Sequence, residues 1–421
     1  QSEARVIRDE KGMAYVYAEN LDDVLKVQGY VMAQDRFFQM TLTKLMASGR
    51  ISELAGKETI ALDTRMRTFG FYRNAKKHVT LLNEETRKML KAFAQGVNAF
   101  VEHSEELHIE FRLAGLTPEQ WLIEDSIAIM YYMGWNSASN MKAELLAQMI
   151  VDQVGIEGYQ QILPIHTNPD DELVPQEKTA MMFPSWEKLS IQTDRKINAM
   201  LQSIDEMSIG SNGWAMSSDR SAGKKPIVAS DPHLDTRILP GTLYPIGLIT
   251  KEIRAVGATV AGIPGILIGR NQYLANGITY AYGDAKDVYI EQIDPTNSNH
   301  YLEGEQSIPF TTIEETIRYR STDAEGGLAE EKVKIRLTKR GPVISDVVSH
   351  APTDKVLTLR WVAYEAMQSS LGLDYLLKAT SVLEMKKILR NLTMANLNLT
   401  FADVEGNIAW QTTGRVPIRQ Y

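Results

Sequence analysis

Cysteine is absent from this sequence of 421 residues. The absence excludes disulfides, thiolate metal sites and a cysteine nucleophile within these residues. It does not decide the cellular compartment, because exported and cytosolic proteins can both lack cysteine. Long apolar runs are absent too: the nearest, residues 127–135, falls short of the roughly 18–20 residues that span a bilayer.

A block of charge of one sign is also missing. The formal net charge is −8, and acidic and basic residues are interspersed along the chain. The sequence therefore carries no electrostatic signature of binding to nucleic acid or to an anionic membrane. With 44% hydrophobic and 23% charged residues, it has the composition of a globular protein and is long enough for two or three domains.

The start of the chain combines a short strand pattern with a long helical one. Alternating residues at 14–18 predict a strand, and apolar residues at helical spacing predict a helix over residues 20–54. Within this helix, Asp35, Arg36 and Gln39 are polar positions on an otherwise apolar background. We expect them to be buried scaffold groups, hydrogen-bonded to one another or to the backbone, and not catalytic residues.

Further helical periodicity covers most of the sequence up to about residue 154. One amphipathic pattern runs over residues 83–116, and Thr117 followed by Pro118 predicts a capped restart of the helix there. Residues 163–210 then lose periodicity and contain several prolines, which predicts a linker.

After residue 211 the pattern changes to short β-branched or alternating runs separated by Gly and Pro turns. One helix is expected over residues 372–392, and residues 396–402 and 408–413 predict a hairpin around a Glu-Gly-Asn turn. Helices first and strands later indicate an α+β fold, with sheets packed face to face and helices outside.

The stretch Gly210-Ser211-Asn212-Gly213-Trp214 draws attention as a possible nucleophile site. It lacks the Gly-x-Ser-x-Gly elbow of an α/β-hydrolase, and a Ser beside Gly is most often a turn residue. Downstream stand a Ser-Ala-Gly-Lys turn at 221–224, an apolar run at 226–229, and Asp231-Pro232-His233-Leu234. Upstream, residues 29–40 (GYVMAQDRFFQM) and 47–56 (ASGRISELAG) form two further motifs.

Together these motifs resemble the penicillin acylase family of N-terminal nucleophile hydrolases. The resemblance implies a four-layer αββα sandwich, an α-chain portion at 1–165, a spacer peptide at 166–210, and the N-terminal part of a β chain at 211–421. It implies autocatalytic cleavage between Gly210 and Ser211, after which the α and β chains stay associated. It also implies that the family pattern continues beyond Tyr421 and that the protein is secreted or periplasmic, with any signal peptide removed before Gln1.

The expected chemistry needs only one residue for both nucleophile and base. A serine hydroxyl reacts poorly until a base takes its proton. Cleavage before Ser211 would free an α-amine, whose ordinary pKa of roughly 7.7–8 suits a general base near neutral pH. The tetrahedral intermediate still requires fixed hydrogen-bond donors.

The resemblance assigns the remaining catalytic residues. Asn398 takes the place of the family's oxyanion-hole Asn, and a backbone N–H near Tyr280 is the second donor. His233 orients the Ser amine or hydroxyl, chiefly through its main chain. Arg419 takes the place of the Arg that supports the Asn, with Arg415 as a competing choice.

Pocket and metal residues are also implied by the resemblance. The acyl pocket is expected to include Met133, Trp135 and Leu234. Asp284 and Asp287 form an Asp-x-x-Asp pair, which on its own is usually a solvated turn and lacks EF-hand spacing. In the family such a pair binds structural Ca²⁺ together with a Glu of the α chain, here Glu144, and oxygen ligands suit that ion. No organic cofactor is expected.

The predicted function is hydrolysis of a linear amide between an acyl group and an amine. Candidate substrates are penicillins, cleaved at the side-chain amide, N-acyl homoserine lactones and other N-acyl amines. Two alternatives stay open: an acylase-like binding or scaffold protein that never matures, and a Ser-His-Asp hydrolase that uses His233. No membrane span and no nucleic-acid partner are expected.

Overall fold

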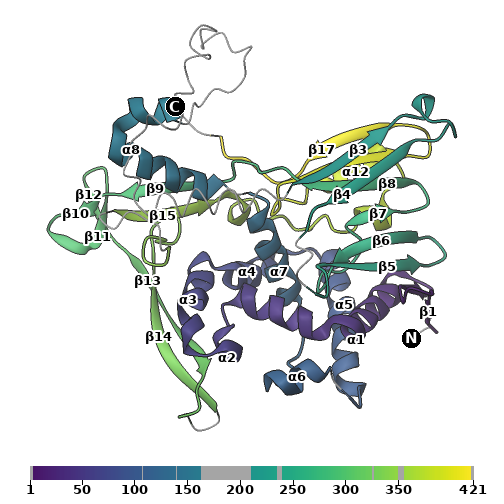
Figure 1. Cartoon of the computed structure of the whole chain (residues 1–421), viewed down its shortest axis with the longest axis horizontal. Helices are drawn as coiled ribbons and strands as arrows, with labels where there is room; N and C mark the ends of the chain where they lie inside the picture. Colours follow the sequence, from purple (N-terminus) through teal and green to yellow (C-terminus); the bar gives the residue numbers. More distant parts are fainter. Residues whose placement is uncertain are drawn as a thin grey trace, which may run out of the picture.

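A computed structural model describes residues 3–106, 108–138, 140–162, 210–234, 239–324, 327–348 and 355–418. The elements before residue 163 are mainly helices, and those after residue 210 are mainly strands. Figure 1 shows the helices α1, α4, α5 and α7 below a twisted sheet, with the long β13–β14 hairpin projecting to one side. No helix among the described residues is long and apolar enough to cross a membrane.

Helices of the first part begin and end at recognisable caps. The Asn20 side chain accepts a hydrogen bond from the Asp23 N–H at 3.0 Å and starts α1. Gly49, with φ of 64°, ends it. The expectation of one helix as far as residue 54 is therefore wrong, because a left-handed glycine interrupts it. The helices are α1 (Leu21–Ser48), α2 (Ser52–Ala55), α3 (Ile60–Phe69), α4 (Phe71–Leu81), α5 (Glu84–His103), α6 (Ile109–Ala114), α7 (Ile123–Asn136) and α8 (Asn140–Ile162).

The predicted helix restart at Thr117 is also wrong, since α7 begins only at Ile123. Tertiary hydrogen bonds explain the difference. The Trp121 N–H donates to the Asn98 side chain at 2.7 Å, and the Trp121 carbonyl accepts from it at 3.0 Å. The Asp125 carboxylate then accepts from the Leu122 N–H at 2.8 Å and marks the true helix start. The backbone groups that a helix from Thr117 would use are thus bonded to α5.

Helices α1 and α5 cross with almost no side chain between their backbones. A Cβ on Gly96 of α5 would lie 1.7 Å from the Lys26 carbonyl oxygen, and one on Gly29 would lie 2.1 Å from the Phe93 carbonyl oxygen. Glycine is required at both positions because no side chain fits. The shared core lies around this crossing and against α7 and the sheet, with fully buried residues such as Leu25, Met32, Phe93 and Ile129.

One eight-stranded sheet joins the two parts of the chain, in the order β1-β2-β5-β6-β7-β8-β16-β17. Strands β2 and β5 pair parallel, and the other neighbours pair antiparallel. The N-terminal strands therefore extend a sheet made largely by residues after 210. The bounds are β1 (Arg5–Arg8), β2 (Ala14–Tyr17), β5 (Leu243–Ile249), β6 (Arg254–Val260), β7 (Ile268–Arg270), β8 (Leu274–Tyr280), β16 (Leu397–Asp403) and β17 (Ile408–Thr412).

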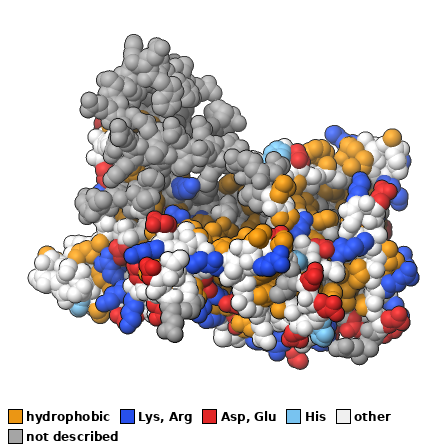
Figure 2. Space-filling view, turned by 60° about the horizontal axis from the view of Figure 1, so that its bottom comes forward, with side chains coloured by type: hydrophobic (Ala, Val, Ile, Leu, Met, Phe, Trp, Pro, Cys, Tyr) orange, Lys and Arg blue, Asp and Glu red, His pale blue; other side chains and the backbone are white. Residues whose placement is uncertain are grey.

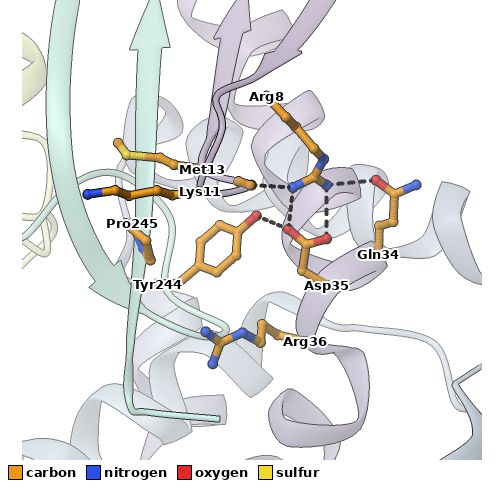
Figure 3. Close-up of a pocket in the computed structure, with 9 residues that line it drawn as sticks. Arg8, Lys11, Met13, Gln34, Asp35, Arg36, Tyr244 and Pro245 are labelled. Carbon is orange, nitrogen blue, oxygen red and sulfur yellow. Dashed lines mark hydrogen bonds and ion pairs between the residues drawn. The ribbon is translucent and has the colours of Figure 1, made fainter.

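A network of polar side chains ties the first strand to α1 and β5 (Figure 3). The Arg8 guanidinium donates to both carboxylate oxygens of Asp35 at 2.8 and 2.9 Å, and the Tyr244 hydroxyl donates to the same carboxylate at 2.6 Å. Arg36 donates to Gln39, whose amide donates to the Pro240 carbonyl. The prediction of paired scaffold groups is confirmed. Their expected burial is wrong, because Asp35 is exposed and Arg36 and Gln39 are partly buried.

A second hairpin, β3 (Ser211–Met216) with β4 (Ile227–Pro232), lies against β8 and β16 (Figure 1). The Ser230 hydroxyl accepts from the Ile278 N–H at 3.1 Å. A Cβ on Gly277 would lie 2.7 Å from the Ser230 Cβ, so glycine lets the hairpin approach β8 closely. This approach sets Ser211 beside the end of the sheet.

The rest of the second part builds the periphery. The predicted helix at residues 372–392 is two short helices, α11 (Tyr375–Lys378) and α12 (Val382–Leu389), because Ser381 caps a new start. The outer strands are β9 (Lys286–Glu291), β10 (Ile293–Asp294), β11 (Asn297–Glu303), β12 (Gln306–Pro309), β13 (Thr311–Arg320), β14 (Leu328–Leu337) and β15 (Val356–Trp361). Figure 2 shows basic and acidic side chains interspersed over the visible face, consistent with the absence of a basic block.

Candidate active site

Ser211 is the first residue of β3 and pairs with Pro232 of β4. Its hydroxyl oxygen accepts a hydrogen bond from the His233 backbone N–H at 3.3 Å. Gly210 precedes it and is exposed, and a Cβ there would have no atom of the described residues within 4 Å. The peptide link before Ser211 thus lies open, and the hydroxyl is held by the main chain of the next strand.

The His233 imidazole is turned to a different partner. Its Nε2 lies 2.9 Å from the Asp231 carboxylate, and the histidine side chain is 44% exposed. Among the described residues, the only hydrogen bond between His233 and Ser211 is the main-chain one. This arrangement does not provide the imidazole-to-hydroxyl contact on which a Ser-His-Asp mechanism depends.

Asn398 lies on β16 between Thr279 of β8 and Thr412 of β17. Its side-chain oxygen accepts from the Trp410 indole N–H at 3.2 Å and from the Thr412 hydroxyl at 3.0 Å. Its side-chain nitrogen donates to the Tyr280 carbonyl at 3.4 Å. Both ends of the amide are therefore engaged, with the nitrogen on the side of β8.

The pairing of β8 with β16 decides the direction of the Tyr280 backbone N–H. The Ala281 N–H donates to the Asn396 carbonyl at 2.9 Å, and Tyr280 is opposite Leu397. Hydrogen-bonded and non-hydrogen-bonded pairs alternate in an antiparallel ladder. Tyr280 and Leu397 are therefore a non-hydrogen-bonded pair, and the Tyr280 N–H is directed away from β16.

Ser211 opens onto an apolar cavity of about 140 Å³. The cavity wall includes the predicted residues Met133 and Leu234 together with His233 and Tyr280. Trp135 lies outside this wall and stacks on Phe69, with ring centroids 4.5 Å apart. The remaining wall is mostly aliphatic: Met130, Val260, Ile263, Leu267, Ile268, Ile278, Leu373, Leu392, Met394 and Leu397.

Most of these wall residues were not predicted from the sequence. They come from α7, β6, β8, β16 and the segments around α11 and α12, and each is an ordinary apolar residue in its local pattern. No local signal could have distinguished them from core residues. Of the two arginine candidates, Arg419 lies outside the described residues, and Arg415 is exposed with no hydrogen bond to Asn398 within the described part.

The predicted metal residues come together elsewhere. Glu144 of α8 and the pair Asp284 and Asp287 place carboxylate oxygens within 4.8 Å of one another, and we call them the acidic cluster. Burial, followed by the nearby aspartates, raises the pKa of Glu144 to about 7. The buried Lys286 ammonium, whose pKa is lowered to about 7 by burial, donates instead to the carbonyls of Trp135 and Ala138.

Asn140 provides a test of whether the acidic cluster fits a cation. Its side-chain nitrogen lies 3.0 Å from a Glu144 oxygen and 2.8 Å from an Asp284 oxygen, and it also contacts the Lys286 carbonyl. An amide nitrogen has two hydrogens, so it can donate to only two of these three acceptor oxygens. The Asn140 side-chain oxygen is buried without a partner in the described part of the chain. This crowding of hard oxygen atoms fits a cation such as Ca²⁺.

A protein-family model, penicillin amidase, matches residues 3–421. The chain belongs to the penicillin amidase family. The match extends over the described site from α1 to β17, including Ser211 and Asn398. Membership of the penicillin amidase family confirms the predicted resemblance, and the mixed helices and strands of the structure confirm the α+β fold class. The individual residue roles stay predictions.

Individual relatives carry two kinds of name. The chain is 31% identical over 431 residues to the penicillin acylase 2 proenzyme of Pseudomonas sp. (strain SE83), covering 99% of this chain and 53% of that protein. It is 27% identical over 420 residues to the acyl-homoserine lactone acylase QuiP of Pseudomonas syringae pv. tomato, covering 99% of this chain and 50% of that protein. The chain thus spans about half the length of these curated relatives.

A solved structure is also similar. It is the thermostable penicillin G acylase from Alcaligenes faecalis in orthorhombic form, with a TM-score of 0.38 and 19% sequence identity. The alignment covers 48% of this chain and 35% of that chain.

Proposed function

We propose that the protein hydrolyses linear acyl amides with Ser211 as the nucleophile, after cleavage of the link between Gly210 and Ser211. The observation that carries the proposal is the position of Ser211 at the mouth of an apolar cavity, with a main-chain donor on its hydroxyl. A buried apolar wall binds an acyl chain, and the hydroxyl at its rim meets the carbonyl carbon. The amine half of the substrate then faces the exposed side of Ser211.

The reaction proceeds in two halves. The α-amine of Ser211 takes the hydroxyl proton while the oxygen attacks the amide carbon, and the tetrahedral oxyanion forms. Collapse breaks the C–N bond, and the leaving amine takes the proton from the α-amine. Water, deprotonated by the same amine, then hydrolyses the acyl ester and releases the acid.

Two donors stabilise the oxyanion in this proposal. The Asn398 side-chain nitrogen and the Tyr280 N–H lie at adjoining ends of β16 and β8, next to the cavity that Ser211 opens onto. Removing one such donor costs on the order of 10²–10³ in kcat in hydrolases that use an oxyanion hole. The main-chain N–H of His233 orients the nucleophile.

The wall chemistry favours an aliphatic acyl group. Aliphatic side chains dominate, the aromatic members are few, and three methionines (Met130, Met133 and Met394) give part of the wall an adaptable shape. Burial of each methylene stabilises by roughly 0.8 kcal/mol. An acyl chain without charge, as in N-acyl homoserine lactones or other N-acyl amines, therefore suits this cavity, and penicillins with apolar side chains remain the second candidate class.

A panel of amides tests the proposal directly. The purified protein would be given butyryl, hexanoyl, octanoyl and phenylacetyl amides of one chromogenic amine, and its N termini would be sequenced. We expect amine release together with a chain that begins at Ser211. A protein that stays uncut and inactive on every amide, with no covalent label from an acylating serine reagent, would instead support the binding or scaffold alternative.

We also propose that the acidic cluster holds a structural Ca²⁺. Glu144, Asp284, Asp287 and the Lys286 carbonyl would supply oxygen ligands, and the bound charge would offset the repulsion between the carboxylates. The ion would tie α8 to the strand that begins at Lys286, away from Ser211. Its role would be structural, and no catalytic step depends on it.

Removal of calcium is expected to lower thermal stability. At about 100 times its dissociation constant, Ca²⁺ would stabilise the folded state by roughly 2.7 kcal/mol. Calorimetry of chelator-treated protein should show a lower Tm that added Ca²⁺ restores. Glu144→Gln should abolish this dependence, whereas Glu157→Gln, at an exposed position of the same helix, should keep it. An equal Tm with chelator and with Ca²⁺ would refute the site.

We also propose a periplasmic or extracellular location, on the basis of the family to which the chain belongs. Fractionation of cells that produce the protein from its full gene tests it. Recovery of the activity in the cytosolic fraction would contradict it.

A further inference from the structure

We propose that Trp410 and Thr412 of β17 are positioning residues that aim the Asn398 amide at the reacting carbonyl. This inference rests on the proposed function, because it concerns the donor that would stabilise the oxyanion. It adds two residues that carry no motif in the sequence. Their contribution is the orientation of Asn398, and neither touches the substrate in this proposal.

The β16–β17 register brings the three side chains to one face. Thr412 is directly opposite Asn398, and Trp410 is opposite Thr400, two residues further along β16. Directly opposite residues and diagonal neighbours two positions away share a face of an antiparallel pair, and a long aromatic side chain can span the diagonal. The indole N–H accordingly reaches the Asn398 oxygen at 3.2 Å and the Thr412 hydroxyl reaches it at 3.0 Å.

The chemistry of these partners determines which end of the amide faces which strand. An indole N–H only donates, so the atom that faces Trp410 must be the amide oxygen. A backbone carbonyl only accepts, so the atom that faces Tyr280 must be the amide nitrogen. A flipped amide would lose both contacts and would set an acceptor where the oxyanion needs a donor. The Trp410 indole, which can only donate, and the Tyr280 carbonyl, which can only accept, therefore allow one orientation of the Asn398 amide.

The orientation leaves a hydrogen available for the substrate. The nitrogen uses one of its two hydrogens in the 3.4 Å contact with the Tyr280 carbonyl. Within the described residues, that carbonyl is its one hydrogen-bond acceptor. The second hydrogen is then available to the oxyanion. Leu397, the residue before Asn398 on β16, and Tyr280 both line the cavity onto which Ser211 opens.

Because Trp410 is largely exposed, a variant can remove its hydrogen bond to Asn398 without disturbing the core, which distinguishes a positioning role from a packing role. Its side chain is 63% exposed, so replacement of the indole by a phenyl ring removes little buried surface. Trp214 of β3 is a matched comparison, because it is 56% exposed and has no hydrogen bond from its indole among the described contacts. Thr412 also allows a conservative replacement that keeps or removes only its hydroxyl.

The test compares Trp410→Phe, Thr412→Val and the double variant on the best amide of the panel. Each single variant should lower kcat about 5- to 10-fold with KM changed less than 2-fold, since the ground-state cavity is untouched. The double variant should approach the loss caused by Asn398→Ala, on the order of 10²–10³. Thr412→Ser should restore most of the activity, and Trp214→Phe should leave kcat unchanged.

The outcomes separate this inference from the proposed function. If the double variant keeps kcat within 2-fold while Asn398→Ala loses activity, the positioning role is wrong and the oxyanion role stands. If Asn398→Ala is itself fully active, the oxyanion assignment fails as well. A loss that appears in KM instead of kcat, or that Thr412→Ser does not rescue, would also overturn the positioning role. Tm measurements on each variant confirm that the fold is intact.

Discussion

Replacement of Ser211 by alanine is expected to reduce acyl-amide hydrolysis by on the order of 10⁴–10⁶ in kcat. The methyl group cannot form the acyl ester, so the reaction would be left with binding and oxyanion stabilisation only. The residue lies at the rim of the cavity and receives the His233 N–H, so its hydroxyl is the one that the bound acyl group would meet. Initial rates of both proteins on the best amide, at protein concentrations determined by absorbance, measure the effect.

The same variant makes a second prediction about maturation. If the Ser211 hydroxyl also attacks its own preceding carbonyl, the alanine protein should remain a single chain across the link from Gly210. Ser218→Ala, in the short turn after β3 and away from the cavity wall, serves as the control and should be cut and active. Unchanged amide hydrolysis by Ser211→Ala would refute the mechanism, whatever the state of the chain.

Gly134→Ala is expected to destabilise the protein by about 3 kcal/mol, the upper part of the usual range for overpacking a core. Gly134 lies near the end of α7, and a Cβ there would lie 2.1 Å from the Met394 carbonyl oxygen. That atom is backbone, so the clash cannot be relieved by a side-chain rotation. In a helix, alanine is normally more stable than glycine by roughly 1 kcal/mol. The predicted loss of stability therefore depends entirely on the contact with Met394.

The effect of Gly134→Ala should extend to catalysis, because the displaced backbone at Met394 leads into β16, the strand that carries Asn398. Asn396 donates its N–H to the Ser137 hydroxyl at 2.8 Å, two residues before Asn398. Urea unfolding monitored by fluorescence would measure the stability, and kcat would report the strand position. Gly223→Ala, at an exposed turn with no atom near the added Cβ, should change the stability by less than about 0.5 kcal/mol. Equal midpoints for the two variants would contradict the contact.

Most of the predicted site residues lie around one cavity, and they were predictable because they stand in sequence motifs. Ser211, His233, Tyr280 and Leu234 all contribute to the wall of one cavity, and Asn398 lies on the strand beside it. Each stands in a contiguous sequence motif that resembles the family. Trp135 instead packs among aromatic rings, since its position on α7 faces the core and not the cavity.

Helix boundaries were less predictable than helix existence. The start of α1 was readable because its cap is local, four residues of sequence around Asn20. The start of α7 was not, because Trp121 bonds to Asn98, 23 residues earlier in the chain. Thr117 and Pro118 offered a good local cap, and long-range hydrogen bonds outweighed it.

The sequence by itself determined the family, the α+β class and the alternation of helical and strand periods, and it singled out Ser211 as the proposed nucleophile, since each depends on residues close together in the chain. Only the tertiary structure decided the aliphatic cavity, the parallel pairing of β2 with β5, and the orientation of the Asn398 amide. These features arise where segments distant in sequence meet, and hydrogen-bond direction and packing at such meetings depend on three-dimensional contacts that no local pattern encodes.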